Sequence, residues 1–201
     1  MKKIGFLFLA AVAMAFVSCS PAEEVVEPVT YNLDAANSTL SWKGSMAVDY
    51  FHTGTVDFKS GSITMEGDSL TAGSFVLDMT SIKNTDLEDK VKASYLEGHL
   101  MGTIVDSMRP QNMFFNTPEY PTVEVKLGAY KDGMLTTTLV ILGTELTQDV
   151  AVRLTADEKG ASLTGKFSMD IADAKIPGFA PSEQGSIATA IEFDLNLKLT
   201  K

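Results

Sequence analysis

Apolar and polar residues alternate along most of this chain. The longest such stretch is the last, where one face carries Ile187, Thr189, Ile191, Phe193, Leu195, Leu197 and Leu199. Strict alternation over that length predicts a long antiparallel strand with one buried face. Shorter alternating sets lie upstream: Leu40 and Trp42; Val56 and Phe58; Ile63 and Met65; Phe75, Leu77 and Met79; Val123, Val125 and Leu127; Leu135, Leu139 and Ile141; Leu146, Gln148, Val150, Val152 and Leu154; Leu163, Gly165, Phe167, Met169 and Ile171.

Polar, glycine-bearing segments separate many of these stretches and predict tight turns. They are Lys59-Ser60-Gly61-Ser62, Glu66-Gly67-Asp68-Ser69, Lys131-Asp132-Gly133 and Asp157-Glu158-Lys159-Gly160. Each has the composition and length of a hairpin connection. We therefore predict an all-β fold, a meander of about eight or more antiparallel strands. Such strands either pair as two sheets or close into a β-barrel, and we favour the barrel because closure removes exposed edges.

The segment from Ile82 to Pro121 lacks alternation and predicts a long loop that contains a short helix. Residues 85–88 have the spacing of a capping box, in which Thr85 accepts a backbone N–H and Glu88 reaches back. Leu87, Val91 and Tyr95 follow at helical spacing, and Gly98 is the expected C-cap. Because long loops in compact β domains are often lids or binding loops, we expect a cover over one barrel mouth. An insertion without such a role is the alternative.

Residues 1–19 have the form of an export signal that ends at the only cysteine. Two lysines precede an apolar run from Ile4 to Val17, shorter than the roughly 20 residues of a membrane-spanning helix. Cys19 follows Ser18 as in a bacterial lipobox, where the thiol is acylated. We expect a signal peptide at 1–18, the lipidated Cys19 with an acidic tether at 19–30, and one folded domain at 31–201. An ordinary signal peptide that happens to contain a cysteine is the alternative.

The acidic composition bears on possible partners. The formal net charge is −10, and removal of Lys2 and Lys3 with the signal brings it to about −12. Nucleic acids and anionic head groups are bound through clustered lysine and arginine, and the sequence has no such cluster, so we expect no nucleic-acid partner.

The expected location is the periplasm or the outer-membrane surface of a Gram-negative bacterium, with acylated Cys19 as the membrane contact. The oligomeric state stays open.

The sequence carries no recognisable catalytic motif. It lacks a nucleophile elbow, a phosphate-binding glycine loop and a calcium loop. The two histidines, His52 and His99, have no metal-ligand spacing, and each taken alone is more often structural or exposed. Asp170 and Asp173 are close in sequence but would fall on opposite faces of a strand. We expect a protein that is not an enzyme, with no metal and no cofactor.

Several spaced segments together resemble the YceI-like family. They are Tyr31-Asn32-Leu33-Asp34, residues 38–44 around Trp42, residues 52–56 from His52, residues 73–82 from Gly73, His99-Leu100, Phe114-Phe115 and Glu119-Tyr120-Pro121-Thr122. The resemblance spans 31 to the C-terminus and implies a lipocalin-like antiparallel barrel of exported bacterial proteins, which encloses a long polyisoprenoid chain. Two departures stand out. Residues 101–113 enlarge the loop relative to the family. Leu142-Gly143-Thr144-Glu145 replaces a basic segment of the family, which weakens the expectation that the ligand carries a pyrophosphate head group.

Taken together, these observations predict a binding protein whose ligand is an isoprenoid or another apolar lipid. An extended isoprenoid needs few polar contacts, since each buried methylene contributes about 0.8 kcal/mol. The candidate cavity residues are Trp42, His52, Phe75, Leu77, Met79, His99, Phe167, Met169, Ile191, Phe193 and Leu195. An ordinary packed core is the alternative for most of them. For the histidines we favour loop fixation over head-group contact, and we expect Phe114 and Phe115 to pin the loop.

Two other functions stay open at this point. The first is a surface interaction module with a filled barrel that uses the loop 86–121. The second is a hydrolase or a metalloprotein built on His52 and His99.

Overall fold

A computed structural model gives the fold and describes residues 26–47, 50–180 and 187–201. The predicted signal peptide and Cys19 lie outside the described residues. The described chain forms ten strands: β1 Val29–Leu33, β2 Thr39–Ala47, β3 Tyr50–Glu66, β4 Ser69–Asn84, β5 Thr122–Lys131, β6 Met134–Ile141, β7 Thr144–Ala151, β8 Arg153–Ala156, β9 Gly160–Asp170 and β10 Ala190–Thr200. It also forms the helix α1, Lys90–Met101, and the 3-10 turns η1 Ala35–Asn37, η2 Gln111–Met113, η3 Ala172–Ala174 and η4 Pro177–Phe179.

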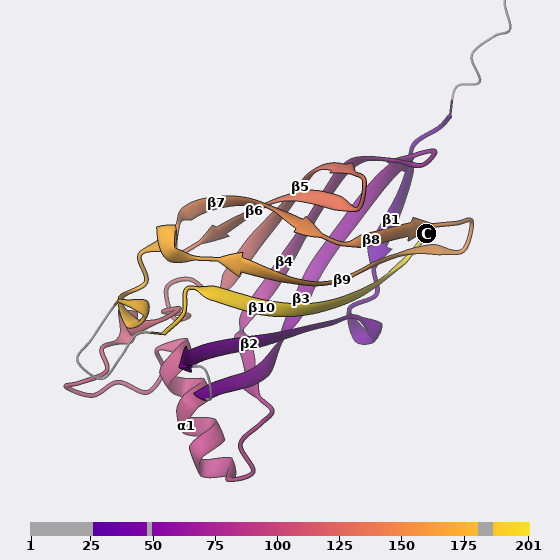
Figure 1. The fold of residues 1–201 in the computed structure, drawn as a ribbon. Helices are drawn as coiled ribbons and strands as arrows, with labels where there is room; N and C mark the ends of the chain where they lie inside the picture. The colour runs from indigo at the N-terminus through magenta and orange to yellow at the C-terminus, as the bar shows by residue number, and fades with distance from the viewer. Residues whose placement is uncertain (1–25, 48–49, 181–186) are drawn as a thin grey trace, which may run out of the picture.

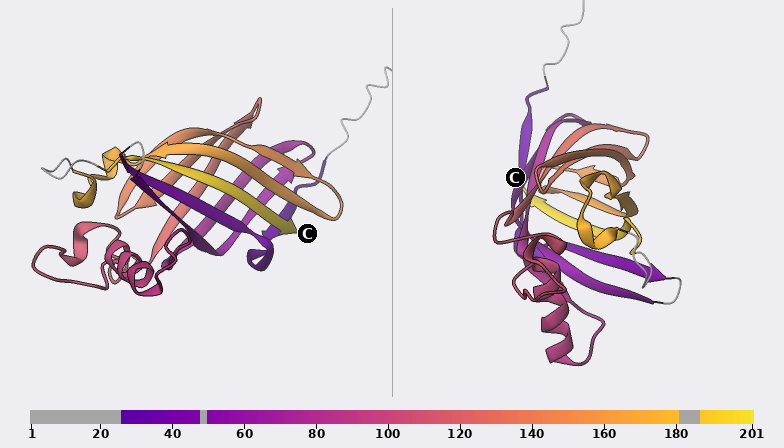
Figure 2. Two further views of the ribbon diagram at one scale, coloured as in Figure 1. Left: turned by 60° about the horizontal axis from the view of Figure 1, so that its bottom comes forward. Right: turned by 90° about the vertical axis from the view of Figure 1, so that its left-hand side faces the viewer.

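The strands form one antiparallel sheet that closes on itself (Figures 1 and 2). Its order is β7-β6-β5-β4-β3-β1-β10-β9-β8, and β2 pairs with β3 and β10 beyond the end of β1. The first and last strands of this order, β7 and β8, are separated in sequence only by Val152. The segment 144–156 therefore joins the two edges of the sheet. The predicted barrel is confirmed, with ten strands instead of about eight.

The barrel closes through a seam between β7 and β9 that side chains complete. The single strand predicted for 146–154 is broken at Val152, whose carbonyl accepts a hydrogen bond from the Tyr130 hydroxyl at 3.3 Å. Within the described residues, β9 pairs with β8 but has no backbone ladder with β7. Gln148 fills this gap, because its amide donates to the Asp170 carbonyl and accepts from the Asp170 N–H at 3.0 Å. This contact explains why a polar residue, Gln148, occupies a position of the alternating pattern that is otherwise apolar.

One half of the barrel is filled by its own side chains. Ile63, Leu135 and Leu197 are its most buried large residues, with 1–2% of their surface exposed. Tyr31 closes this end, since its ring is buried and its hydroxyl donates to the Asp157 carbonyl at 2.9 Å. Full burial of each such aliphatic side chain contributes about 1.5–3 kcal/mol. β1, the C-terminus and this packed half lie at the end of the barrel that is remote from α1 (Figure 1).

Two turn assignments need correction. Lys59–Ser62 was predicted to be a turn but lies inside β3, where the register shifts between Phe58 and Ser60. Gly61 is there because the Phe75 ring packs across it: a Cβ at position 61 would lie 2.0 Å from a Phe75 ring carbon. A turn that the sequence reading missed joins β6 to β7 through Leu142 and Gly143, both at positive φ. The other three predicted turns are confirmed.

The helix exists, but its predicted ends are wrong. Asp89 is the N-cap, and its carboxylate accepts from the Val91 and Lys92 N–H groups. The predicted cap residue Thr85 instead pairs with the Thr53 hydroxyl at 3.1 Å, so the capping box does not form. The C-cap is Gly102 in the left-handed conformation, and Gly98 lies within the helix. Val91, placed on the apolar face by the spacing, is 79% exposed.

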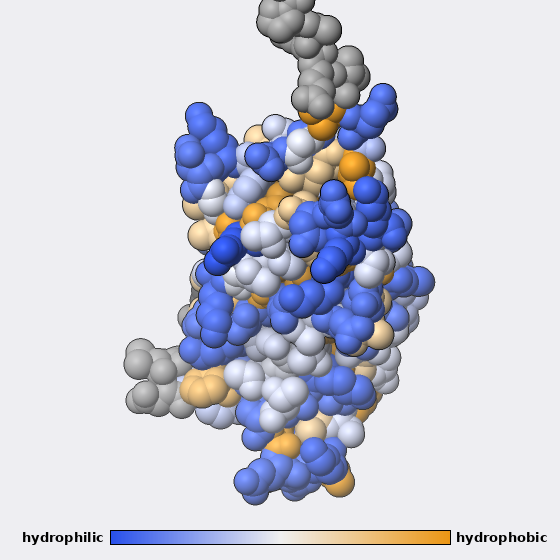
Figure 3. Space-filling model, turned by 90° about the vertical axis from the view of Figure 1, so that its right-hand side faces the viewer, coloured by the Kyte–Doolittle hydropathy of each residue, from blue (hydrophilic) through white to orange (hydrophobic). Residues whose placement is uncertain are grey.

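The surface at the packed end of the barrel is largely polar. Figure 3 shows the face at the packed end, where hydrophilic residues cover most of the barrel and hydrophobic ones form a narrow strip. Among the described helices, none is both long and apolar enough to cross a membrane.

Candidate ligand-binding cavity

The half of the barrel next to α1 contains a cavity of about 620 Å³. Apolar side chains from the strands, and from Ile171 directly after β9, form its walls: Val56, Leu77, Met79, Ile82, Val123, Leu139, Ile141, Met169, Ile171 and Ile191. Small-molecule sites in proteins occupy about 300–1,000 Å³ and are lined mostly by such residues. The barrel is thus neither wholly filled nor wholly hollow, since the packed half forms the floor of the cavity.

The structure brings most of the predicted cavity residues together. The cavity is lined by Trp42, His52, Leu77, Met79, His99, Met169, Ile191 and Phe193. Trp42 is held by a hydrogen bond from its indole N–H to the Thr55 carbonyl at 3.2 Å. Its ring covers Gly54 on β3, which leaves no room for a side chain there.

Three predicted residues lie elsewhere. Phe75 and Leu195 are buried in the core, and Phe75 packs edge-on against Phe58 at 5.9 Å between ring centroids. Phe167 lines a separate hollow of about 610 Å³ whose walls include the exposed ion pairs Lys43–Glu192 and Lys166–Asp194. Alternation placed all three on the inward face, but it does not say how far along the barrel the cavity reaches.

The long loop between β4 and β5 covers the open end of the cavity, as the sequence predicted. The Phe114 ring packs edge-on against His99 at 4.9 Å and against Phe179 of η4 at 5.6 Å between centroids. The Phe115 N–H donates to the Leu100 carbonyl at 3.0 Å. Both phenylalanines pin the loop, and both also line the cavity. They therefore belong to the candidate site as well as to its support.

Glu97 attaches α1 to the end of β4. Only 9% of its surface is exposed, and its carboxylate accepts from the Asn84 backbone N–H at 2.9 Å. The other carboxylate oxygen is 3.3 Å from the ammonium group of Lys83, whose side chain is mostly exposed. The Asn84 N–H, where the long loop begins, is thus bonded to Glu97 of the helix within that same loop.

Replacing Glu97 with alanine should destabilise the domain by about 1–3 kcal/mol, because the Asn84 N–H would lose its partner in a partly buried place. Glu97→Gln keeps an acceptor oxygen and gives up only the contact with exposed Lys83, which is worth about 0–1 kcal/mol. Urea unfolding of both variants tests this. Equal losses in the two variants would assign the stabilisation to the ion pair instead.

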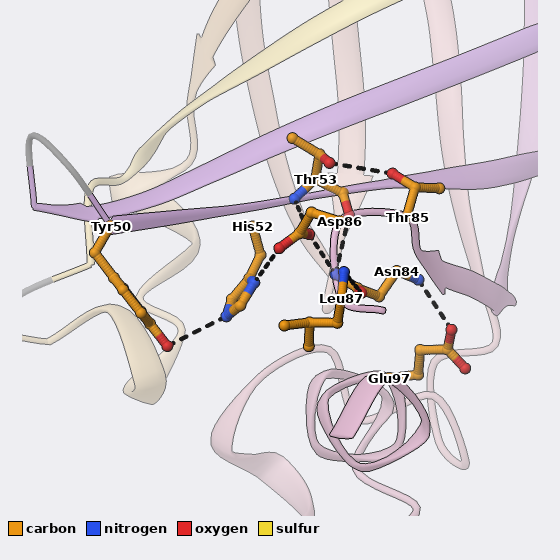
Figure 4. Close-up of polar contacts among 8 residues, drawn as sticks. All are labelled: Tyr50, His52, Thr53, Asn84, Thr85, Asp86, Leu87 and Glu97. Atoms are coloured by element: carbon orange, nitrogen blue, oxygen red, sulfur yellow. Dashed lines mark hydrogen bonds and ion pairs between the residues drawn. The ribbon is translucent and has the colours of Figure 1, made fainter. Parts of the chain in front are cut away.

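A network of polar contacts surrounds His52, a residue of the cavity lining (Figure 4). The His52 Nδ1 is 2.9 Å from an Asp86 carboxylate oxygen, and its Nε2 is 3.3 Å from the Tyr50 hydroxyl. The other Asp86 oxygen accepts from the Thr53 N–H at 2.7 Å and the Asn84 amide at 2.6 Å. Burial alone would raise the pKa of Asp86, but these hydrogen bonds outweigh it and hold the pKa below 3.8.

Two basic residues, Lys92 of α1 and Arg109 of the enlarged loop, also line the cavity. The Arg109 guanidinium pairs with Asp106 at 2.8 Å and lies over the Tyr95 ring at 5.3 Å. The absence of the family's basic segment at 142–145 therefore does not leave the mouth without positive charge. Sequence reading missed both residues, because their distance in sequence from the cavity strands gives no sign that the loop folds over the mouth.

The matched family model covers residues 31–199 and is that of the YceI-like domain. The chain belongs to the YceI-like family. Among solved structures, a polyisoprenoid binding domain from Saccharophagus degradans is 17% identical, with 85% of this chain and 97% of that chain covered and a TM-score of 0.59. BcnA from Burkholderia cenocepacia is 16% identical, with 84% and 99% covered and a TM-score of 0.60. Among curated proteins, no match was found.

Gly44 on β2 is another cavity position of this YceI-like domain that the sequence analysis did not predict. A Cβ placed there would have only one heavy-atom neighbour within 4 Å, the Ile191 Cδ1 at 3.9 Å. The residue lies between Trp42 and Met46 in the alternation, on the face that lines the cavity. The absence of a side chain at this position leaves space inside the barrel. A glycine in a strand pattern was a usable signal, because strand glycines often mark the close approach of a ligand or of backbone.

No group of three or more histidine, cysteine, aspartate and glutamate side chains with metal-binding geometry occurs in the described part of the YceI-like domain. His52 and His99 both line the cavity but have different partners. His52 is bound to Asp86, whereas His99 packs against Phe114.

Acidification should destabilise this YceI-like domain through His99. Burial lowers the pKa of His99 below 6.5, and the nearby Arg109 guanidinium lowers it further against the opposing effect of Asp106. Between the folded-state pKa and 6.5 the unfolded chain binds more protons, so stability falls as the pH decreases through that window. Urea unfolding at about pH 7.5 and about pH 5.5 measures the loss. His99→Phe should show a smaller loss, and an undiminished loss in this variant would place the titrating group elsewhere.

Proposed function

We propose that the protein sequesters or carries a long apolar ligand of isoprenoid type, such as a polyprenyl chain or a quinone tail, inside its barrel. The observation that carries this proposal is the apolar cavity between the packed half of the barrel and the lid. The cavity is sized for a small-molecule ligand and has polar groups only at its mouth. A chain of apolar carbons gains about 0.8 kcal/mol for each methylene that it buries there.

The family and one structural neighbour agree with this ligand class. The domain from Saccharophagus degradans, which shares this fold, is described as binding a polyisoprenoid. The strands that form the cavity also favour a flexible ligand, since Met46, Met79 and Met169 line it and methionine adapts its shape to irregular partners. Binding, not catalysis, is the role that these residues support.

Extraction of bound lipid tests the proposal directly. The full-length protein would be purified from the envelope of the native host, and the lipid that it holds without a covalent bond would be extracted with organic solvent and identified by mass spectrometry. A stoichiometric isoprenoid is the expected result. An extract without lipid, together with no uptake of added prenol or quinone in native mass spectrometry, would overturn the proposal in favour of a surface interaction module.

The sequence of the leader supports a lipid anchor at Cys19 and export to the periplasm or the outer-membrane surface. The first described strand, β1, begins at Val29 at the end of the barrel that is remote from α1 (Figure 1). An anchor upstream of β1 would therefore attach to the packed end and leave the cavity mouth pointing away from it. This arrangement suits transfer of the ligand to an acceptor beyond the anchoring membrane.

Metabolic labelling with a radioactive fatty acid tests the anchor. The wild-type protein should take up label and sediment with membranes, and Cys19→Ser should do neither. Membrane association of the unlabelled Cys19→Ser protein would contradict acylation at this residue.

A further inference from the structure

The mouth of the cavity contains a hydrogen-bond acceptor whose direction is fixed by the surrounding residues. Asp86 is a carboxylate, so both of its oxygens can only accept hydrogen bonds. One oxygen takes the Thr53 N–H and the Asn84 amide, and the other takes the His52 Nδ1 at 2.9 Å (Figure 4). The Nδ1 must therefore carry the hydrogen. In the neutral ring, the Nε2 is then left as a lone-pair acceptor.

This acceptor is available to a ligand. Both His52 and Tyr50 line the cavity, and the Nε2 faces the Tyr50 hydroxyl at 3.3 Å. Tyr50 is 55% exposed, so its hydroxyl can turn to water when another donor takes its place. The His52 ring is held from the opposite side by Asp86 and edge-on by the Tyr50 ring, whose centroid lies 5.3 Å away. The acceptor is thus rigid and sits next to an apolar cavity.

The charges around His52 favour an uncharged head group. The Asp86 carboxylate lies one imidazole ring away from any group bound at the Nε2, and it would repel an anion there. Of the two basic residues that line the cavity, Arg109 is already paired with Asp106 at 2.8 Å, and no hydrogen bond or ion pair within the described residues joins Lys92 to His52 or Asp86. A neutral donor such as a hydroxyl satisfies the Nε2 without this repulsion.

We propose that His52 recognises the hydroxyl group of an isoprenoid alcohol, with Asp86 as the positioning residue that fixes the ring tautomer. This inference rests on the proposed function, because the tail of the alcohol occupies the apolar cavity. The hydroxyl donates to the Nε2, while a ligand that offers only acceptors at its head, such as an ether, cannot make this bond and leaves the Nε2 to the distant Tyr50 hydroxyl at 3.3 Å. A neutral hydrogen bond contributes about 0.5–1.5 kcal/mol, which corresponds to roughly a two- to twelvefold preference for the alcohol.

The test compares farnesol with farnesyl methyl ether, which share one tail, on the full domain by isothermal titration calorimetry. The wild-type protein should bind farnesol several-fold more tightly. In Asp86→Asn, the new amide nitrogen donates to the Nδ1 and moves the ring hydrogen to the Nε2, so the preference should fall to about one. His52→Phe should also lose the preference for farnesol. Because this variant has no Nε2, its ratio of affinities measures the effect of the larger ether group alone.

The outcomes separate the two proposals. If both ligands bind but the wild type, Asp86→Asn and His52→Phe all show the same ratio, the head-group assignment is overturned and the carrier function stands. If neither ligand binds to the wild-type protein, both proposals fail. If Asp86→Asn only disorders the mouth, the affinities for the alcohol and the ether should fall equally and their ratio should stay high. That result would also contradict the role of Asp86 in fixing the His52 tautomer.

Discussion

Gly44→Phe should remove ligand binding while the barrel stays folded. The new ring would project into the cavity next to Ile191, because nothing else lies within 4 Å of the added Cβ. If it displaces about three methylenes of the ligand, the loss is about 2.4 kcal/mol, or roughly fifty-fold in affinity. Stability should stay equal or rise, since a strand glycine costs about 0.5–1 kcal/mol and the aromatic ring gains a buried place.

A second phenylalanine on the same strand provides the matched control. Thr39 is exposed and lies on the outer face of β2, so Thr39→Phe adds the same ring outside the barrel. It should bind farnesol as the wild type does. Binding by native mass spectrometry and stability by urea unfolding would be measured on both variants. Undiminished binding by a stable Gly44→Phe protein would place the ligand outside the cavity.

The alternation in the sequence was enough to predict antiparallel strands with one buried face. Such strands also form two-sheet sandwiches, and the barrel was favoured because closure removes exposed edges. The same pattern could not place the boundary between the packed and hollow halves. Phe75 and Leu77 are neighbours in one apolar phase, yet Phe75 is part of the core and Leu77 lines the cavity. The two residues differ in which residues lie opposite them on the neighbouring strands. This depends on the register between strands, which the alternation pattern does not determine.

The errors at turns and at the helix end have a common physical origin. The sequence predicts a turn at Gly61, but the role of this glycine is to make room for the Phe75 ring. The sequence predicts a capping box from Thr85 to Glu88, but Thr85 and Asp86 bind Thr53 and His52 on a neighbouring strand. In each case a contact distant in sequence replaced the local one. Local propensity is a weak guide wherever a tertiary partner of that kind exists.

Gly54→Ala should be the most destabilising single methyl addition among the strands. The added Cβ would lie 1.9 Å from the Lys83 carbonyl oxygen and 2.3 Å from a ring carbon of Trp42. The carbonyl belongs to the β4 backbone that pairs with Gly54, so it cannot move without breaking that pairing. Overpacking of this kind typically costs about 1–3 kcal/mol, and a clash with backbone lies at or above the upper end of that range.

The loss matters against a total domain stability of about 5–15 kcal/mol. Gly44→Ala on the adjacent strand is the matched control, since its Cβ makes only an ordinary contact at 3.9 Å and should leave stability nearly unchanged. Urea unfolding of both variants gives the free energies. Adding Trp42→Leu to Gly54→Ala should not restore stability, because the Lys83 carbonyl remains in the way. If the free energy of unfolding of Gly54→Ala lies within about 1 kcal/mol of that of the wild type, β4 must be able to move away from β3 at this point. The barrel wall under Trp42 would then be more deformable than the close packing of protein interiors implies.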